Sequence, residues 1–215
     1  MALQYREGTE ADTDAVSDAY SDSFSSDAIT QRLFPPTCPQ SLVCIKDWLG
    51  GGLKDPHSRY ILAVDPALSG KESVVALAKW VAPSAAAEPV SPEAEDWASR
   101  IDWPEGSDVA LGTEFFTMLE KKHEEHMGGR PHWYLELLAV RKGYQGKGVG
   151  KHLLKWGLEL ADKDRLEVYL QAGPAGVPLY RKCGFEDIEV YTVSSIGFTE
   201  TFMRRKARPS QATLP

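Results

Sequence analysis

The chain has 215 residues, 42% of them hydrophobic and 26% charged, so it can bury a core within one domain. Its 24 Lys and Arg against 31 Asp and Glu give a net charge of −7, which argues against binding to nucleic acid or to an anionic membrane surface. The three cysteines, Cys38, Cys44 and Cys183, are irregularly spaced, which argues against a disulfide framework and a cysteine-rich zinc site.

The N-terminal part of the chain predicts one strand, two helices and a hairpin. It has neither a signal peptide pattern nor an apolar stretch of about 18 residues, so we expect a cytoplasmic protein that does not enter a membrane. Thr9 and Asp12 have the spacing of a capping box, and Gly50 to Gly52 should end the second helix. The expected elements are a strand over Leu3 to Arg6, helices over Thr9 to Phe24 and Ser41 to Leu49, and paired strands over Tyr60 to Val64 and Ser73 to Val81.

The middle of the chain changes in composition. Residues 83–112 are rich in Ala, Pro, Glu and Ser, which predicts an insertion with one helix rather than a second domain. Trp97 and Trp103 within it either line a binding site or pack onto the domain. A helix over Thr113 to Met127 should follow, and its His123 and His126 are three positions apart, whereas a zinc-binding helix needs four. We therefore expect a solvated helix end and no metal site.

The last third alternates strands and helices, and the chain as a whole predicts seven strands in one α/β domain over residues 1–206. A polar, flexible tail should cover residues 207–215. The expected strands are His132 to Val140, Leu166 to Gln171, Phe185 to Thr192 and Gly197 to Arg204, and the expected helices are Lys147 to Asp162 and Pro174 to Cys183.

A glycine-rich turn between a strand and a helix carries the strongest chemical signal. Glycines at 146, 148 and 150 leave backbone amides uncovered at a helix N-terminus, where the helix dipole is positive. Such amides bind a phosphate or diphosphate, and Lys147 and Lys151 add positive charge. The spacing does not match a Walker loop, because Val149 and Gly150 stand where Lys and Ser or Thr are required. It is also a poor match to the dinucleotide-binding Gly-x-Gly-x-x-Gly pattern.

Gln145-x-x-Gly148-x-Gly150 resembles the Gln/Arg-x-x-Gly-x-Gly/Ala signature of GNAT-type N-acetyltransferases. The flanks extend the resemblance, with Leu138-Ala139-Val140 before the signature and Leu179-Tyr180-Arg181-Lys182-Cys183-Gly184-Phe185 after it. The resemblance is close over about residues 134–185. It implies a mixed, mostly antiparallel sheet of about seven strands, splayed between the fourth and fifth strands, with helices on both faces.

The resemblance also implies where acetyl-CoA binds as the acyl donor. Its pantetheine arm would pair with the fourth strand, and its diphosphate would rest on the glycine loop. The implied donor-binding residues are Leu138, Ala139, Val140, Gln145, Gly146, Lys147, Gly148, Val149, Gly150 and Lys151. The amide of Val140 would polarise the thioester carbonyl.

Two residues are implied to move protons. Tyr180 matches the family tyrosine that faces the thioester sulfur and is the candidate general acid. Glu136 is the candidate base, directly or through a water, and strand alternation places it on the same face as Leu138 and Val140. One departure is Gly173, which stands where many members have an Asn that contacts pantetheine.

The expected function is therefore transfer of an acetyl group from acetyl-CoA to a primary amine by direct attack in a ternary complex, without a metal. The acceptor would be a small-molecule or peptide amine, and the protein a monomer or homodimer. Two alternatives stay open: a non-catalytic acyl-CoA sensor or scaffold, and a nucleotide-binding module that uses the same loop.

Overall fold

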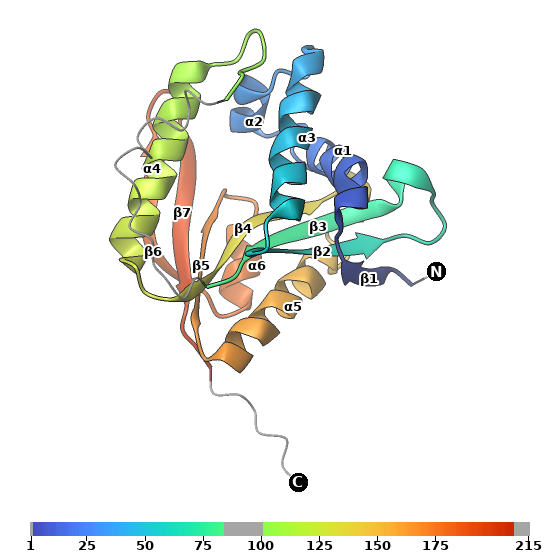
Figure 1. Ribbon diagram of the computed structural model, residues 1–215. Coiled ribbons are helices and arrows are strands. Elements are labelled where there is room, and N and C mark those ends of the chain that lie inside the picture. Colours follow the sequence, from blue (N-terminus) through green and yellow to red (C-terminus); the bar gives the residue numbers. More distant parts are fainter. Residues whose placement is uncertain (1, 84–100, 209–215) are drawn as a thin grey trace.

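A computed structural model describes residues 2–83 and 101–208 (Figure 1). Residues 84–100, which hold most of the predicted insertion with its helix and Trp97, lie outside the described residues, as does most of the predicted tail, 209–215. No helix of the described part is long and apolar enough to cross a membrane.

A single mixed sheet forms the centre of the molecule, in the strand order β1-β2-β3-β4-β5-β7-β6. Neighbouring strands are antiparallel except β4 and β5, which are parallel. This arrangement confirms the predicted fold class and all seven expected strands. The strands are β1 (Gln4–Glu7), β2 (Ser58–Val64), β3 (Val74–Val81), β4 (His132–Val140), β5 (Glu167–Ala172), β6 (Glu186–Val193) and β7 (Phe198–Arg205).

Helices cover both faces of this sheet (Figure 1). On one face α5 packs its apolar side against β3, β4 and β5, and α6 joins the same core. On the other face α1 and α3 cover β2, β3 and β4, whereas α2 and α4 lie over β5 and β7. The helices are α1 (Thr13–Ser23), α2 (Ala28–Leu33), α3 (Pro39–Lys54), α4 (Val109–Met127), α5 (Val149–Asp164) and α6 (Val177–Lys182).

One predicted helix end was wrong, and one short helix was not predicted. The helix α3 continues through Gly50 to Gly52 instead of ending there, because these glycines allow close packing. A Cβ atom at Gly52 would lie 2.4 Å from the Tyr60 hydroxyl, and one at Gly50 would lie 3.0 Å from Thr13. The short helix α2 was not foreseen, although Asp27 caps it by accepting a hydrogen bond from the Thr30 amide. Tertiary packing thus decides where these helices lie.

The histidines of α4 also differ from expectation. The side chains of His123 and His126 are half-buried between α4 and the sheet, whereas Glu124 and Glu125 are exposed. The His123 ring stacks on Tyr169, and its Nε2 lies 2.6 Å from His132 Nε2. Burial lowers the pKa of His123 to about 4, so this pair is neutral near pH 7. The part of the chain described here holds no group of three or more His, Cys, Asp or Glu side chains suited to a metal ion.

The sheet opens between β4 and β5. Their pairing runs from His132 with Glu167 to Leu135 with Leu170 and stops there, although β4 continues to Val140. On its other edge β4 stays paired with β3 as far as Val140. A bulge interrupts that ladder, because Lys79 pairs with Leu137 and Trp80 with Leu135, leaving Glu136 unopposed. The second half of β4 therefore presents one free backbone edge toward β5.

Candidate active site at the opening between β4 and β5

The glycine loop forms a cradle of free backbone amides. Gly146 and Gly148 have φ angles of 71° and 83°, a conformation that other residues rarely adopt, and Gly148 is the N-cap of α5. Among the described residues, none accepts a hydrogen bond from the backbone amides of residues 146–151. A Cβ atom added at Gly146 or Gly148 would point into open space. The loop therefore has the form of an anion site at a helix N-terminus.

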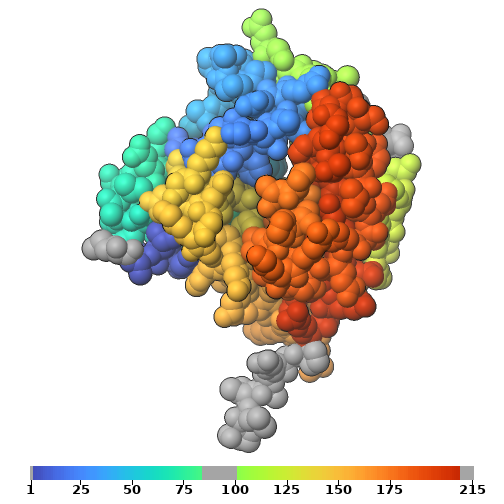
Figure 2. Space-filling view, turned by 180° about the vertical axis from the view of Figure 1, so that it is seen from behind, coloured from blue at the N-terminus to red at the C-terminus, as the bar shows by residue number. Residues whose placement is uncertain are grey.

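Contacts with the end of β4 and with the N-terminal third hold the glycine loop in place. Gln145 Nε2 donates to the Val140 carbonyl at 2.9 Å, which ties the loop to the end of β4. The Lys142 amide donates to Asp22 Oδ2 at 2.9 Å, and the Arg141 guanidinium lies 2.7 Å from Asp18 Oδ2. Figure 2 shows this part of the chain as a yellow surface beside the blue N-terminal residues and the orange segment after β5.

The free edge of β4 directs its amides into the opening. The Arg141 amide donates to the Val75 carbonyl of β3 at 2.9 Å. Because successive amides of a strand point in opposite directions, the Val140 and Leu138 amides point toward β5 instead. The side chains of Leu138 and Val140 pack on the α5 face, where both lie within about 4 Å of the Cβ position of Gly150, at 3.7 and 3.5 Å.

Tyr180 lies on α6, which follows β5 and reaches the same point. Its neighbour Leu179 comes within 3.6 Å of the Cβ position of Gly150, so α6, the start of α5 and the end of β4 converge. The Tyr180 ring is buried and packs edge-on against Phe185. Burial, with a smaller contribution from Glu200, raises the pKa of Tyr180 above that of a free tyrosine. The phenol therefore stays protonated and can act as a proton donor.

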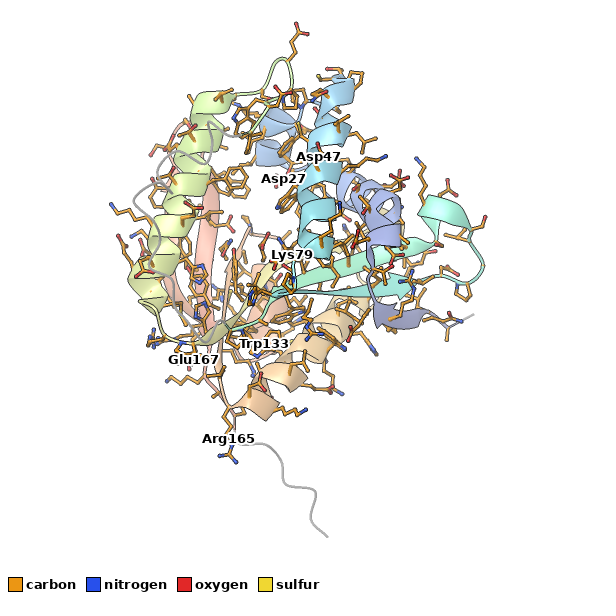
Figure 3. The ribbon with its side chains drawn as sticks, in the orientation of Figure 1. Asp27, Asp47, Lys79, Trp133, Arg165 and Glu167 are labelled. Atoms are coloured by element: carbon orange, nitrogen blue, oxygen red, sulfur yellow. The ribbon has the colours of Figure 1, made fainter. Side chains whose placement is uncertain are left out.

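Glu136 lies on the face of the sheet opposite the one expected. Its carboxylate binds Lys79 Nζ at 2.6 Å, and this ammonium also lies 5.7 Å from the ring centroid of Trp48 on α3. The simple alternation that predicted a shared face with Leu138 and Val140 fails because of the bulge at Glu136. Glu136 thus faces α3, on the side of the sheet away from α5. Figure 3 shows Lys79 near the middle of the sheet, below the space between α4 and α3.

A second acidic residue of this face was missed. Glu200 on β7 is only 5% exposed, and burial raises its pKa to about 8, with a smaller effect from Asp27. The sequence carries a signal for it, because Phe198, Glu200 and Phe202 alternate along one face of the strand. A carboxyl between buried aromatic side chains is unusual, because Glu residues are rarely buried.

The structure also shows the surroundings of Gly173 and Trp103, two residues that the sequence analysis singled out. Gly173 begins the turn between β5 and α6, and a Cβ atom there would lie 3.3 Å from the Phe198 ring, so Phe198 takes part of the room that an Asn would need. Trp103 stacks on Phe34 with a centroid distance of 6.1 Å. A depression of about 410 Å³ between α4 and Tyr191 contains none of the predicted site residues.

Comparison with known proteins matches this region to one family. Residues 116–185, which include β4, the glycine loop, α5, β5 and α6, match the model of the acetyltransferase (GNAT) family. The segment that holds the candidate site is therefore similar to GNAT acetyltransferases. Solved structures extend the likeness from this segment to the whole fold. A Corynebacterium glutamicum structure, described as histone acetyltransferase HPA2 and related acetyltransferase, is 22% identical, has a TM-score of 0.64 and covers 98% of this chain and 99% of its own.

Two further proteins are similar to this chain. Arylalkylamine N-acetyltransferase 2 from Aedes aegypti is 14% identical with a TM-score of 0.71, over 97% of this chain and 100% of its own. An acetyltransferase from Stachybotrys chartarum is 30% identical over 95 residues, or 44% of this chain and 40% of that protein. The chain spans 40% and 31% of the curated relatives it matches.

Proposed function

We propose that this protein is an N-acetyltransferase that transfers an acetyl group from acetyl-CoA to a primary amine by direct attack in a ternary complex. The observation that carries the proposal is the run of unpartnered amides over residues 146–151, next to the opening between β4 and β5. An anion site at one end of an unpaired strand edge suits a long ligand with a diphosphate at one end and an amide-containing arm.

The residues present fit such a donor. Backbone amides from Gln145 to Lys151 would hold the diphosphate, since Gly146 and Gly148 leave the approach to these amides open. The backbone of Leu138, Ala139 and Val140 would pair with the pantetheine arm as an additional strand would. Neither step needs a metal.

The amide of Val140 is the proposed oxyanion donor. It points into the opening from a strand that β3 holds in place, so it needs no rearrangement when negative charge develops on the carbonyl oxygen. One such donor contributes about 3 kcal/mol to lowering the barrier. The reaction would then occur at the level of Val140, between the loop and the face that Glu136 occupies.

Proton transfer is assigned to Tyr180 and Glu136. Tyr180, with its raised pKa, would protonate the departing thiolate. Glu136 would take a proton from the acceptor nitrogen through a water, because Lys79 already occupies one of its oxygens. Its position on the face away from α5 lets an amine approach opposite the donor, and the net charge of −7 favours a cationic acceptor.

Two measurements on the purified protein test this function. Calorimetry with CoA measures binding, and CoA release from acetyl-CoA in the presence of phenylethylamine, putrescine or a short peptide measures transfer. We expect heat on adding CoA and amine-dependent release. Binding without release for every amine tried would favour the acyl-CoA sensor instead, and competition by ATP for the same site would favour a nucleotide-binding module.

A further inference from the structure

Glu200 lies on β7 just beyond the point where the pairing with β5 ends. The pairing of β7 with β5 ends at Thr201 and Ala172, so Glu200 is the first residue of β7 beyond the end of β5. On the other edge it pairs with Tyr191 of β6. It lies next to the turn that leads from β5 to Tyr180, on the same edge of the opening.

The Glu200 side chain is buried, and its carboxyl has no protein partner among the described residues. The residue is only 5% exposed, yet its carboxyl oxygens are not among the fully enclosed polar atoms, so a ligand can reach them. The titratable groups near it are Asp27, Tyr134, Tyr169 and Tyr180, and none of these carries a positive charge. Burying a carboxyl without a partner is unfavourable, which marks Glu200 as a candidate for binding a ligand.

The side chain faces the acceptor side. Glu200 shares its face with Phe198 and Phe202, which pack under α4, whereas Met203 of the same strand packs with α5. Asp27, which precedes α2, adds negative charge on this side, and Figure 3 shows it between α4 and α3. An amine bound at Glu200 would therefore approach the opening from the side opposite the glycine loop.

The two acidic residues of this face differ in what they can accept. Glu136 is already neutralised by Lys79 at 2.6 Å. Glu200 has both oxygens available for a cation. An ammonium group offers three N–H donors, which a buried carboxylate without other partners can accept at short range.

We infer that Glu200 binds the ammonium group of the acceptor directly and removes its first proton, an inference that rests on the proposed acetyltransferase function. The acceptor class is accordingly a primary amine that enters the site as a cation, and Glu200 is a catalytic residue. Glu136 keeps the second, water-mediated role.

The proton balance closes with these residues. The ammonium nitrogen gives one proton to Glu200 and, as an amine, forms the bond to the acetyl carbon while the carbon–sulfur bond breaks. Tyr180 protonates the thiolate, and Glu200 returns its proton to the Tyr180 phenolate. The second proton leaves the nitrogen through water to Glu136 and then to solvent, so the products are the amide, CoA thiol and one released proton.

The test compares Glu200→Gln with Glu186→Gln, a substitution of an exposed glutamate on β6 whose side chain is 71% exposed. At saturating acetyl-CoA, Glu200→Gln should lower kcat/KM for phenylethylamine or putrescine roughly 100-fold or more. It should also remove the rise of kcat/KM with pH, which in the unmodified protein should be centred near the pKa of about 8 of Glu200. CoA binding measured by calorimetry should stay within about twofold.

The inference is overturned if Glu200→Gln keeps the kcat/KM and the pH profile of the unmodified protein. If Glu200→Gln misfolds and loses CoA binding, Glu200→Asp is measured instead. This variant keeps the carboxyl group, so it should retain part of the activity and shift the pH profile of kcat/KM. An unshifted profile in Glu200→Asp would also overturn it. If the unmodified protein binds CoA but acetylates no amine, the proposed function fails first, and that outcome is visible before any variant is made.

Discussion

The ammonium of Lys79 on β3 lies 2.6 Å from the carboxylate of Glu136 on β4, and their side chains are only 9% and 22% exposed. The pair sits at the bulge where β4 begins to separate from β5. It therefore joins two strands at the point where the sheet opens, and it fixes the orientation of Glu136 toward the acceptor side.

Replacement of Glu136 with Gln should reduce both stability and turnover. The change leaves the Lys79 cation buried without its counter-ion, which costs about 3 kcal/mol or more of unfolding free energy. Denaturant unfolding measures the first effect. If Glu136 relays a proton, kcat at saturating amine should fall roughly 10-fold or more at a temperature where the variant is folded. A variant with unchanged kcat would remove Glu136 from the proton path.

Replacement of Tyr180 with Phe separates chemistry from binding. The ring should keep its packing against Phe185, so CoA affinity by calorimetry should change less than about twofold. Turnover should fall roughly 100-fold, since the thiolate loses its proton donor. Equal turnover in the two proteins would show that Tyr180 serves packing alone.

Replacement of Gly148 with Asp should abolish CoA binding. Residue 148 has a φ of 83°, so any side chain strains the backbone, and a carboxylate would repel the diphosphate. Gly51→Asp on α3 is a matched control, because a Cβ atom there meets nothing within 4 Å. Calorimetry should show heat with the control and none with Gly148→Asp. Similar binding in both variants would mean that CoA does not use the glycine loop.

The pH dependence of stability should report the buried Glu200. Its pKa is about 8 in the fold against 4.5 for a free Glu, so the folded state holds a proton that the unfolded chain releases. Stability from this residue is complete below pH 4.5 and is lost as the pH rises to about 8, by about 1.4 kcal/mol per pH unit.

Glu200→Gln removes that loss, so the variant should gain stability relative to the unmodified protein between pH 5 and pH 8, within the range set by the pKa of about 8. Urea unfolding at a series of pH values measures the difference. Because His123, whose pKa is about 4, titrates equally in both proteins, the difference isolates Glu200. A constant difference across this range would mean that Glu200 has an ordinary pKa.

The prediction of the donor-binding residues came from local patterns. The glycines at 146, 148 and 150 and the Leu-Tyr-x-x-x-Gly-Phe element around Tyr180 are contiguous signals. The strands followed from short-range periodicity, whereas the arrangement of the sheet was implied by the resemblance to GNAT-type N-acetyltransferases. The acceptor half depends on contacts between distant segments. The bulge that turns Glu136 toward Lys79 comes from the pairing of β3 with β4, which no local pattern records.

Long-range packing also explains the other differences. The helix α3 runs through Gly50 to Gly52 because Thr13 and Tyr60 approach it closely. The position of Glu200 at the opening depends on β5 ending beside it at Ala172, which lies 28 residues earlier in the chain. Its alternation with Phe198 and Phe202 was a local clue to burial, but not to the absence of a partner.

Titration of CoA into the purified protein by calorimetry tests the central claim most directly, because the backbone amides of residues 146–151 are proposed to bind the diphosphate. We expect saturable, one-to-one binding that free diphosphate competes with and that Gly148→Asp eliminates. Folded protein that gives no heat with CoA, or that binds CoA equally well with Asp at position 148, would contradict the account.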